Sequence, residues 1–170
     1  GLSSHAEGFN TTASNNSSHS EGYSTTASGT YSHAEGYSTK ASGSSSHAEG
    51  YSTTSSGAYS HVEGRASSSS GSYSHAEGYS SVASSTSSHA EGYDTTASGT
   101  YSHSGGYKTY ADKSCMTAIG KYNVYNSDDT TLNDGKLFVV GNGTEETIDE
   151  ETIITRNDAF VVKDTGDVYV

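Results

Sequence analysis

The histidines of this chain constrain its fold more than any other feature, because all eight recur every 14 residues from His5 to His103. Each histidine is preceded by a serine and is followed three residues later by a glycine. A glutamate lies two residues after each of the first seven histidines, and Gly105 takes its place in the last copy. A fixed period without insertions or deletions is the sequence signature of a solenoid, in which each copy forms one coil.

Each copy divides into two similar heptads, such as "TTASGTY" and "SHAEGYS". Regularly spaced glycine and β-branched threonine oppose a helix and favour two short strands per coil, separated by glycine-containing turns. Alternate residues of a strand share a face, so Ser4, Ala6 and Gly8 lie together. His5 and Glu7 then lie on the opposite face. We predict that the small residues fill a thin interior and that the large ones face outward.

The composition excludes several classes of protein. Only 29% of the residues are hydrophobic and the net charge is −12, so an ordinary packed core is hard to build. Eight scattered Lys and Arg residues argue against nucleic acid as a partner. The single Cys115 excludes an internal disulfide framework. No apolar run is long enough to span a bilayer, so we expect no membrane insertion in this segment.

The repeat resembles the YadA-like head of trimeric adhesins, a left-handed parallel β-roll that repeats a serine-x-alanine-x-glycine unit twice per 14-residue coil. The stretches that carry the resemblance are "SHAEG" and "TTASG", and it covers residues 1 to about 113. It implies an all-β, left-handed parallel β-roll solenoid and a trimer of three rolls side by side. The family commonly has Val and Ile at the two x positions, where this chain has His and Glu.

The composition changes after the last repeat, and we predict a β-rich stem over residues 114–170 that follows the β-roll of residues 1–113. "TAIG" is a candidate last coil. "KLFVVGNGT" and "DAFVVKDTGDVYV" are strand-like runs bounded by glycine turns, and the acidic "EETIDEETIITRN" is expected to be a loop or hairpin. "LFVVGNGT" and "RNDAFVVKDTGDVYV" resemble the segment ahead of the self-cleaving chaperone in phage tail fibres and appendages. Gly1 falls in the phase of Gly29, which predicts a piece of a longer fibrous protein.

We expect a homotrimer, because an interior of methyl-sized groups buries little apolar area within one chain. The outward histidines and glutamates are the predicted inter-chain polar seam, in which a charge-assisted bond would pair them. The seam residues are His5, Glu7, His19, Glu21, His33, Glu35, His47, Glu49, His61, Glu63, His75, Glu77, His89 and Glu91.

Imidazole and carboxylate in columns could also form a ladder of metal sites. We favour the structural seam, because structural networks outnumber ligand ladders, and expect no metal and no cofactor. An enzyme is not expected either. Serine, histidine and glutamate recur in every copy, whereas a catalytic triad needs one specific geometry.

Two further columns are candidates for surface contact. Tyrosines follow the glycines at Tyr23, Tyr37, Tyr51, Tyr79 and Tyr93. They either shield the corners of the roll or contact sugars or protein. Thr-Thr pairs such as Thr25-Thr26 raise ice binding as an alternative, although Lys40, Ser68, Val82 and Tyr110 interrupt their column.

These observations predict a structural or attachment segment of a trimeric extracellular fibre. The resemblance implies a phage or prophage tail fibre or appendage that binds a glycan or protein receptor on the bacterial cell surface. A bacterial trimeric surface adhesin head is the alternative, and an ice-binding β-solenoid is the second. The expected location is extracellular, on a virion tail or a bacterial surface.

Overall fold

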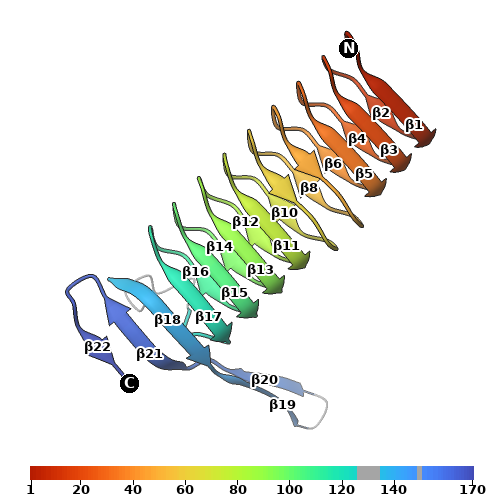
Figure 1. Ribbon diagram of the computed structural model, residues 1–170. Coiled ribbons are helices and arrows are strands. Elements are labelled where there is room, and N and C mark those ends of the chain that lie inside the picture. Colours follow the sequence, from red (N-terminus) through yellow and green to blue (C-terminus); the bar gives the residue numbers. More distant parts are fainter. Residues whose placement is uncertain (126–134, 149–150) are drawn as a thin grey trace.

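The computed structural model describes residues 1–125, 135–148 and 151–170, and every regular element within them is a β-strand. A regular stack of coils runs from the N-terminus to a small C-terminal group of strands, beside which a two-stranded hairpin projects (Figure 1). The all-β prediction is confirmed for the described residues.

Each coil contributes one strand to each of two parallel sheets. The first sheet holds the histidine-bearing strands: β1 (His5–Phe9), β3 (His19–Tyr23), β5 (His33–Tyr37), β7 (His47–Ala48), β9 (His61–Val62), β11 (His75–Tyr79), β13 (His89–Tyr93) and β15 (His103–Tyr107). The second holds two-residue strands: β2 (Thr12–Ala13), β4 (Thr26–Ala27), β6 (Lys40–Ala41), β8 (Thr54–Ser55), β10 (Ser68–Ser69), β12 (Val82–Ala83), β14 (Thr96–Ala97) and β16 (Tyr110–Ala111).

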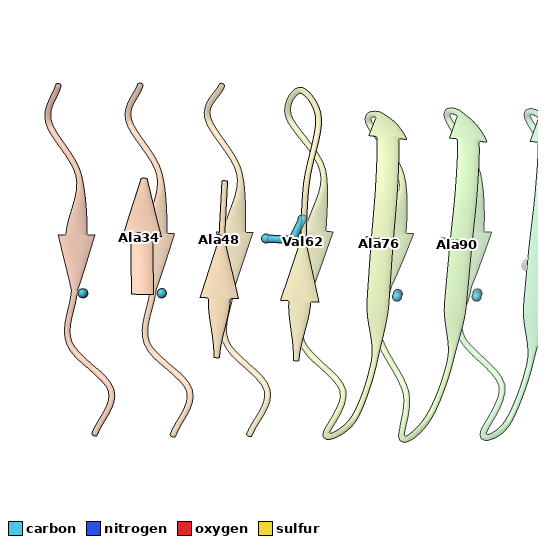
Figure 2. Close-up of a cluster of buried hydrophobic side chains, with 9 residues drawn as sticks. Ala34, Ala48, Val62, Ala76 and Ala90 are labelled. Carbon is cyan, nitrogen blue, oxygen red and sulfur yellow. The ribbon is translucent and has the colours of Figure 1, made fainter. Parts of the chain in front are cut away.

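The pairing register equals the sequence period. His19 pairs with His33, and each following residue of β3 pairs with the residue 14 positions later. The small side chains therefore stack in a row between the two sheets, as Figure 2 shows for Ala34, Ala48, Val62, Ala76 and Ala90, each of which is 0% exposed. The predicted parallel β-solenoid with 14-residue coils and an interior of small residues is confirmed.

Most hydroxyl groups inside the solenoid find hydrogen-bond partners, either within the same coil or in an adjacent one. Where serine replaces the interior alanine of the first sheet, its hydroxyl meets a threonine, as Ser20 Oγ does with Thr25 Oγ1 at 2.8 Å. The serine before each histidine has a separate role, because Ser32 Oγ donates to the Gly29 carbonyl at 2.7 Å. Buried polar atoms are costly unless they are hydrogen-bonded, so these pairs allow a core rich in serine.

The corners of the coils depend on left-handed backbone conformations. Every seventh residue from Ser3 to Tyr122 has a positive φ although none of them is glycine. The backbone amide of such a residue donates a hydrogen bond to a carbonyl of the preceding coil. For example, Ser38 N donates to the Tyr23 carbonyl at 2.8 Å. Gly36 also has a positive φ, and a Cβ there would lie 2.3 Å from the Gly50 carbonyl oxygen. Close stacking of coils therefore requires glycine at this corner.

The parallel ladder continues beyond the last histidine. β17 (Thr117–Lys121), which contains "TAIG", pairs in register with β15 and forms one more coil strand. β18 (Lys136–Asn142) adds in parallel to β17, with Thr117 opposite Phe138. β21 (Asp158–Lys163) and β22 (Val168–Tyr169) complete the sheet in antiparallel orientation. The division at residue 113 stays a prediction.

The acidic stretch forms the predicted hairpin, with β19 (Thr144–Ile148) antiparallel to β20 (Glu151–Thr155). The C-terminal strands pack over a second core cluster of larger apolar residues, which is made of Ala111, Met116, Ala118, Val139 and Val161. A nearly buried ion pair joins β18 to β21, where Lys136 Nζ lies 2.8 Å from Asp158 Oδ2.

Candidate functional site

The histidines form a continuous column on the outer face of the first sheet. Neighbouring imidazole rings lie 4.7 to 5.2 Å apart between centroids and are stacked, from His5 to His103. The strand register imposes this spacing, because parallel strands lie about 4.8 Å apart. The glutamates lie in a parallel column beside the histidines, so the structure brings the residues of the predicted seam together within one chain.

Within one chain, however, the histidines make almost no hydrogen bonds with the glutamates. His47 Nε2 lies 3.8 Å from Glu35 Oε1, which is too long for a hydrogen bond. The contact between His103 Nε2 and Glu91 Oε1, at 3.2 Å, does qualify. Buried Nε2 atoms without a hydrogen-bond partner belong to His19, His33, His47, His61, His75 and His89. The histidine column therefore has unused bonding capacity along most of its length.

The stacked carboxyl groups of the glutamate column perturb one another. Hydrogen bonds to Glu49 and Glu21, together with burial, raise the pKa of Glu35 to about 7. Hydrogen bonds to Glu77 and Glu49 raise the pKa of Glu63 to about 7 in the same way. The pKa values of Glu21, Glu49 and Glu77 are lowered, chiefly by the hydrogen bond from a protonated neighbour. Near pH 7, Glu35 and Glu63 are therefore partly protonated and share hydrogen-bonded protons with their neighbours in the column.

The histidine column favours the neutral imidazole. Burial lowers the pKa of His33, His47 and His75, and the charges of neighbouring histidines lower it further. Glutamates beside them act in the opposite direction with a smaller effect. At neutral pH these three imidazoles are therefore mainly neutral, beside a glutamate column in which Glu35 and Glu63 carry only part of their charge.

A shallow groove follows the glutamate column along the first coils. Its lining alternates glutamate and glycine, from Glu7 and Gly8 to Glu49 and Gly50. A similar but smaller groove lies over Glu77, Gly78, Glu91, Gly92 and Gly106. Because the glycines carry no side chain, the carboxylates stand along an open trough that solvent or another chain can enter.

The tyrosines form a second stacked column at the ends of the histidine-bearing strands. Tyr23, Tyr37 and Tyr51 stack with centroids 4.9 Å apart, and each ring is 43% to 47% exposed. Arg65 interrupts the tyrosines in sequence but not in space, because its guanidinium lies 5.4 Å from the ring centroids of both Tyr51 and Tyr79. The planar cation continues the stack. Tyr93 extends it beyond Tyr79 at 4.8 Å.

The outer face of the second sheet is less regular. From the second coil onward the first threonine of each pair is buried, as Thr25 and Thr53 are, and only the second faces outward. The outward positions pair in register through Lys40, Ser68, Val82 and Tyr110 as well as through threonines. The structure therefore places at most one threonine per coil at these outward positions, in an interrupted column.

Comparison with known proteins leaves the function to be argued from this geometry. No protein-family model matches the chain, and no curated protein sequence matches it. Among the described residues, no helix has the length and apolar character that crossing a bilayer would require.

Proposed function

We propose that the chain is a structural and attachment segment of a homotrimeric extracellular fibre, in which three left-handed parallel β-rolls lie side by side and a β-rich stem follows. The observation that carries this proposal is the core of the coils. Its main cluster consists of eight alanines and one valine, Val62. Such side chains bury little apolar area, so association with other chains supplies the burial that a single roll lacks.

The histidine and glutamate columns are the proposed contact between the three chains. From His19 onward the paired side chains are already only about one third exposed within a single chain, as with His33 at 34% and Glu35 at 32%. The part of each imidazole and carboxylate that stays exposed offers polar contacts to a neighbouring chain. A polar contact of this kind would also fix the register of the three rolls, since each layer repeats the same pair.

The fibre is proposed to belong to a phage or prophage tail, as a tail fibre or appendage, and to bind a glycan or protein on the bacterial surface. Support comes from the C-terminal strands built from "LFVVGNGT" and "RNDAFVVKDTGDVYV" and from the exposed tyrosine column. A trimeric adhesin head on a bacterial surface is the second candidate. The repetitive geometry favours an architectural role over catalysis, because every coil presents the same groups.

The mass of the native particle tests the trimer. Light scattering behind a sizing column, in buffer with a chelator, is expected to give about three times the 17.6 kDa of one chain. Replacing Glu35 and Glu63 by lysine is expected to reduce the particle mass, because unpaired cations would then be buried at the proposed contact between the chains. The matched variant with lysine at Tyr59 and Tyr73, which lie at exposed corners, is expected to keep the mass. A monomer in the unaltered protein would overturn the proposal.

Binding to bacterial cells tests the attachment role. Labelled protein is expected to bind cells of its host, and Tyr37→Ser with Tyr51→Ser is expected to weaken binding at least tenfold. A matched control replaces Tyr59 and Tyr73, which stack at 5.1 Å in a separate column. Equal loss in both variants would contradict a specific role for the tyrosine column.

A further inference from the structure

The histidine and glutamate columns together form a repeated three-residue cluster. In one example, Glu35, His47 and Glu49 each offer one ligand atom, and these atoms lie within 4.8 Å of one another. Six such triads follow one another along the described coils, beginning with Glu7, His19 and Glu21. Each triad contains one imidazole and two carboxylates from adjacent coils of the same chain.

We propose that these columns are a ladder of binding sites for a divalent transition-metal ion of the zinc class. Zinc is bound in proteins by imidazole nitrogen and carboxylate oxygen, and sites with three protein ligands leave a fourth position for water. Mg²⁺ and Ca²⁺ prefer oxygen ligands alone, so the histidine in every triad favours a transition metal. Because one chain supplies all three ligands, the ladder does not depend on the proposed trimer.

The distances within the triads suit a shared ion better than a hydrogen bond. The nitrogen-to-oxygen gaps are 3.8 Å for His61 with Glu49 and 3.6 Å for His89 with Glu77. Two ligands of one tetrahedral zinc, each bound at about 2.0–2.1 Å, are about 3.3 Å apart. The widest pair of ligand atoms in a triad is up to 4.8 Å apart, so side-chain shifts of up to about 1.5 Å would close the triad around an ion.

The buried nitrogen atoms supply an independent reason. The Nε2 atom of His47 is buried, lacks a hydrogen-bond partner and faces the carboxylates of its triad. Buried polar atoms in native proteins are nearly always partnered by protein, water or an ion. The same holds for the other five histidines with buried Nε2 atoms. A bound cation at each triad would satisfy these atoms.

The glutamates can serve two neighbouring triads at once. Glu35 directs Oε2 toward His33 at 3.9 Å and Oε1 toward His47 at 3.8 Å. One carboxylate can therefore bridge two ions without sharing an oxygen. The column carries seven carboxyl groups, so three divalent ions in alternate triads would offset most of its negative charge. We expect at least three ions per chain and at most six.

Zinc uptake by the untagged, chelator-treated protein tests the proposal. Isothermal titration and equilibrium dialysis with elemental analysis are expected to give three or more zinc ions per chain. The variant His33→Gln, His47→Gln and His61→Gln removes the imidazole of three triads and is expected to lose roughly half of the uptake. The matched variant Thr26→Gln, Lys40→Gln and Thr54→Gln alters outward positions of the second sheet and is expected to bind as the unaltered protein does. Fewer than three zinc ions per chain, or equal uptake in both variants, would overturn the ladder.

A spectroscopic measurement keeps the test decisive if the histidine variant does not fold. X-ray absorption of the zinc-loaded, unaltered protein is expected to show a shell of nitrogen and oxygen at about 2.0–2.1 Å with imidazole scattering. A shell without imidazole would overturn the proposal. The particle mass measured in chelator reports on the trimer separately, so failure of the ladder and failure of the fibre can be told apart.

Discussion

The coils and the C-terminal strands are stabilised in different ways. The coils stack identical layers whose core is alanine, serine and threonine, and their backbone ladders repeat every 14 residues. The C-terminal strands pack larger side chains such as Met116 and Val139 and combine parallel with antiparallel pairing. Stability is therefore spread evenly over the coils, whereas at the C-terminal end it depends on a few residues.

Single substitutions are therefore expected to affect the stability of the two regions differently. In a solenoid each coil contacts only its neighbours, so most substitutions act locally and modestly. The exceptions are backbone positions that every layer needs. At the C-terminal end, a nearly buried ion pair between Lys136 and Asp158 joins β18 to β21 in addition to their backbone pairing.

The largest effect is expected from Asp158→Ala. The Asp158 carboxylate lies 2.8 Å from Lys136 Nζ and also accepts a hydrogen bond from the Val124 amide at 2.7 Å. Removing one partner of a buried ion pair typically costs about 3–5 kcal/mol. We expect the C-terminal strands to lose protection from hydrogen exchange while the coils before β15 keep theirs.

Asp167→Ala is the control for this change, because Asp167 is exposed and its carboxylate accepts a hydrogen bond from the Thr165 hydroxyl at 2.7 Å. Its expected cost is below about 1 kcal/mol. Loss of protection throughout the coils in Asp158→Ala would contradict the local character of the coil contacts.

A smaller difference in unfolding free energy is expected between glycine substitutions in the coils and at the C-terminal end. Gly36 and Gly166 both have a positive φ, but only Gly36 faces a backbone oxygen where a Cβ would lie. We expect Gly36→Ala to cost about 3 kcal/mol from strain and close contact, and Gly166→Ala about 1 kcal/mol from strain alone. Denaturant unfolding at a fixed protein concentration measures both. Equal costs would show that coil spacing adjusts to a methyl group.

The coil geometry was largely predictable from the sequence because its period is also its pairing register. Histidine keeps its position in all eight copies and glutamate in seven, while the residue between them is always small, so the faces of the strands follow from alternation. The left-handed corner residues could not be predicted, since Tyr31, Ser38 and Cys115 have no chemistry in common there. The layers above and below impose their conformation through backbone hydrogen bonds.

Other features depended on spatial neighbours that a sequence pattern does not specify. Arg65 looked like an exception among the tyrosines, although its planar guanidinium suits the stack. The parallel pairing of β18 with β17 could not be predicted from the sequence either. Alternation predicts which residues of a strand share a face, but not which strand lies beside it. At the candidate site, the residue types were predictable from the sequence. The long His–Glu distances and the burial of the Nε2 atoms were not, because they depend on side-chain positions.

The smallest expected effect is a pH-dependent difference within the glutamate column. The pKa of Glu35 and of Glu63 is raised to about 7 in the folded chain, so folding favours their protonated forms. The stability that they contribute is complete below about pH 4.5 and is lost as the pH rises through about 7. Glutamine mimics the protonated carboxyl. We therefore expect the variant Glu35→Gln with Glu63→Gln to melt roughly 2–4 °C above the unaltered protein at pH 8 and equally with it at pH 5.

The comparison at each pH isolates the glutamates from the histidines that face them. The pKa values of His33, His47 and His75 are lowered, so these residues contribute stability that is present above about pH 6.5 and is lost as the pH falls. That contribution is common to both proteins and cancels in the difference. Thermal melts in the presence of a chelator measure the difference in melting temperature between the two proteins. Glu151→Gln, on the exposed hairpin, is the control. A variant less stable than the unaltered protein at pH 8 would mean that these carboxylates are paired with cations, in which case their mutual repulsion does not govern the column.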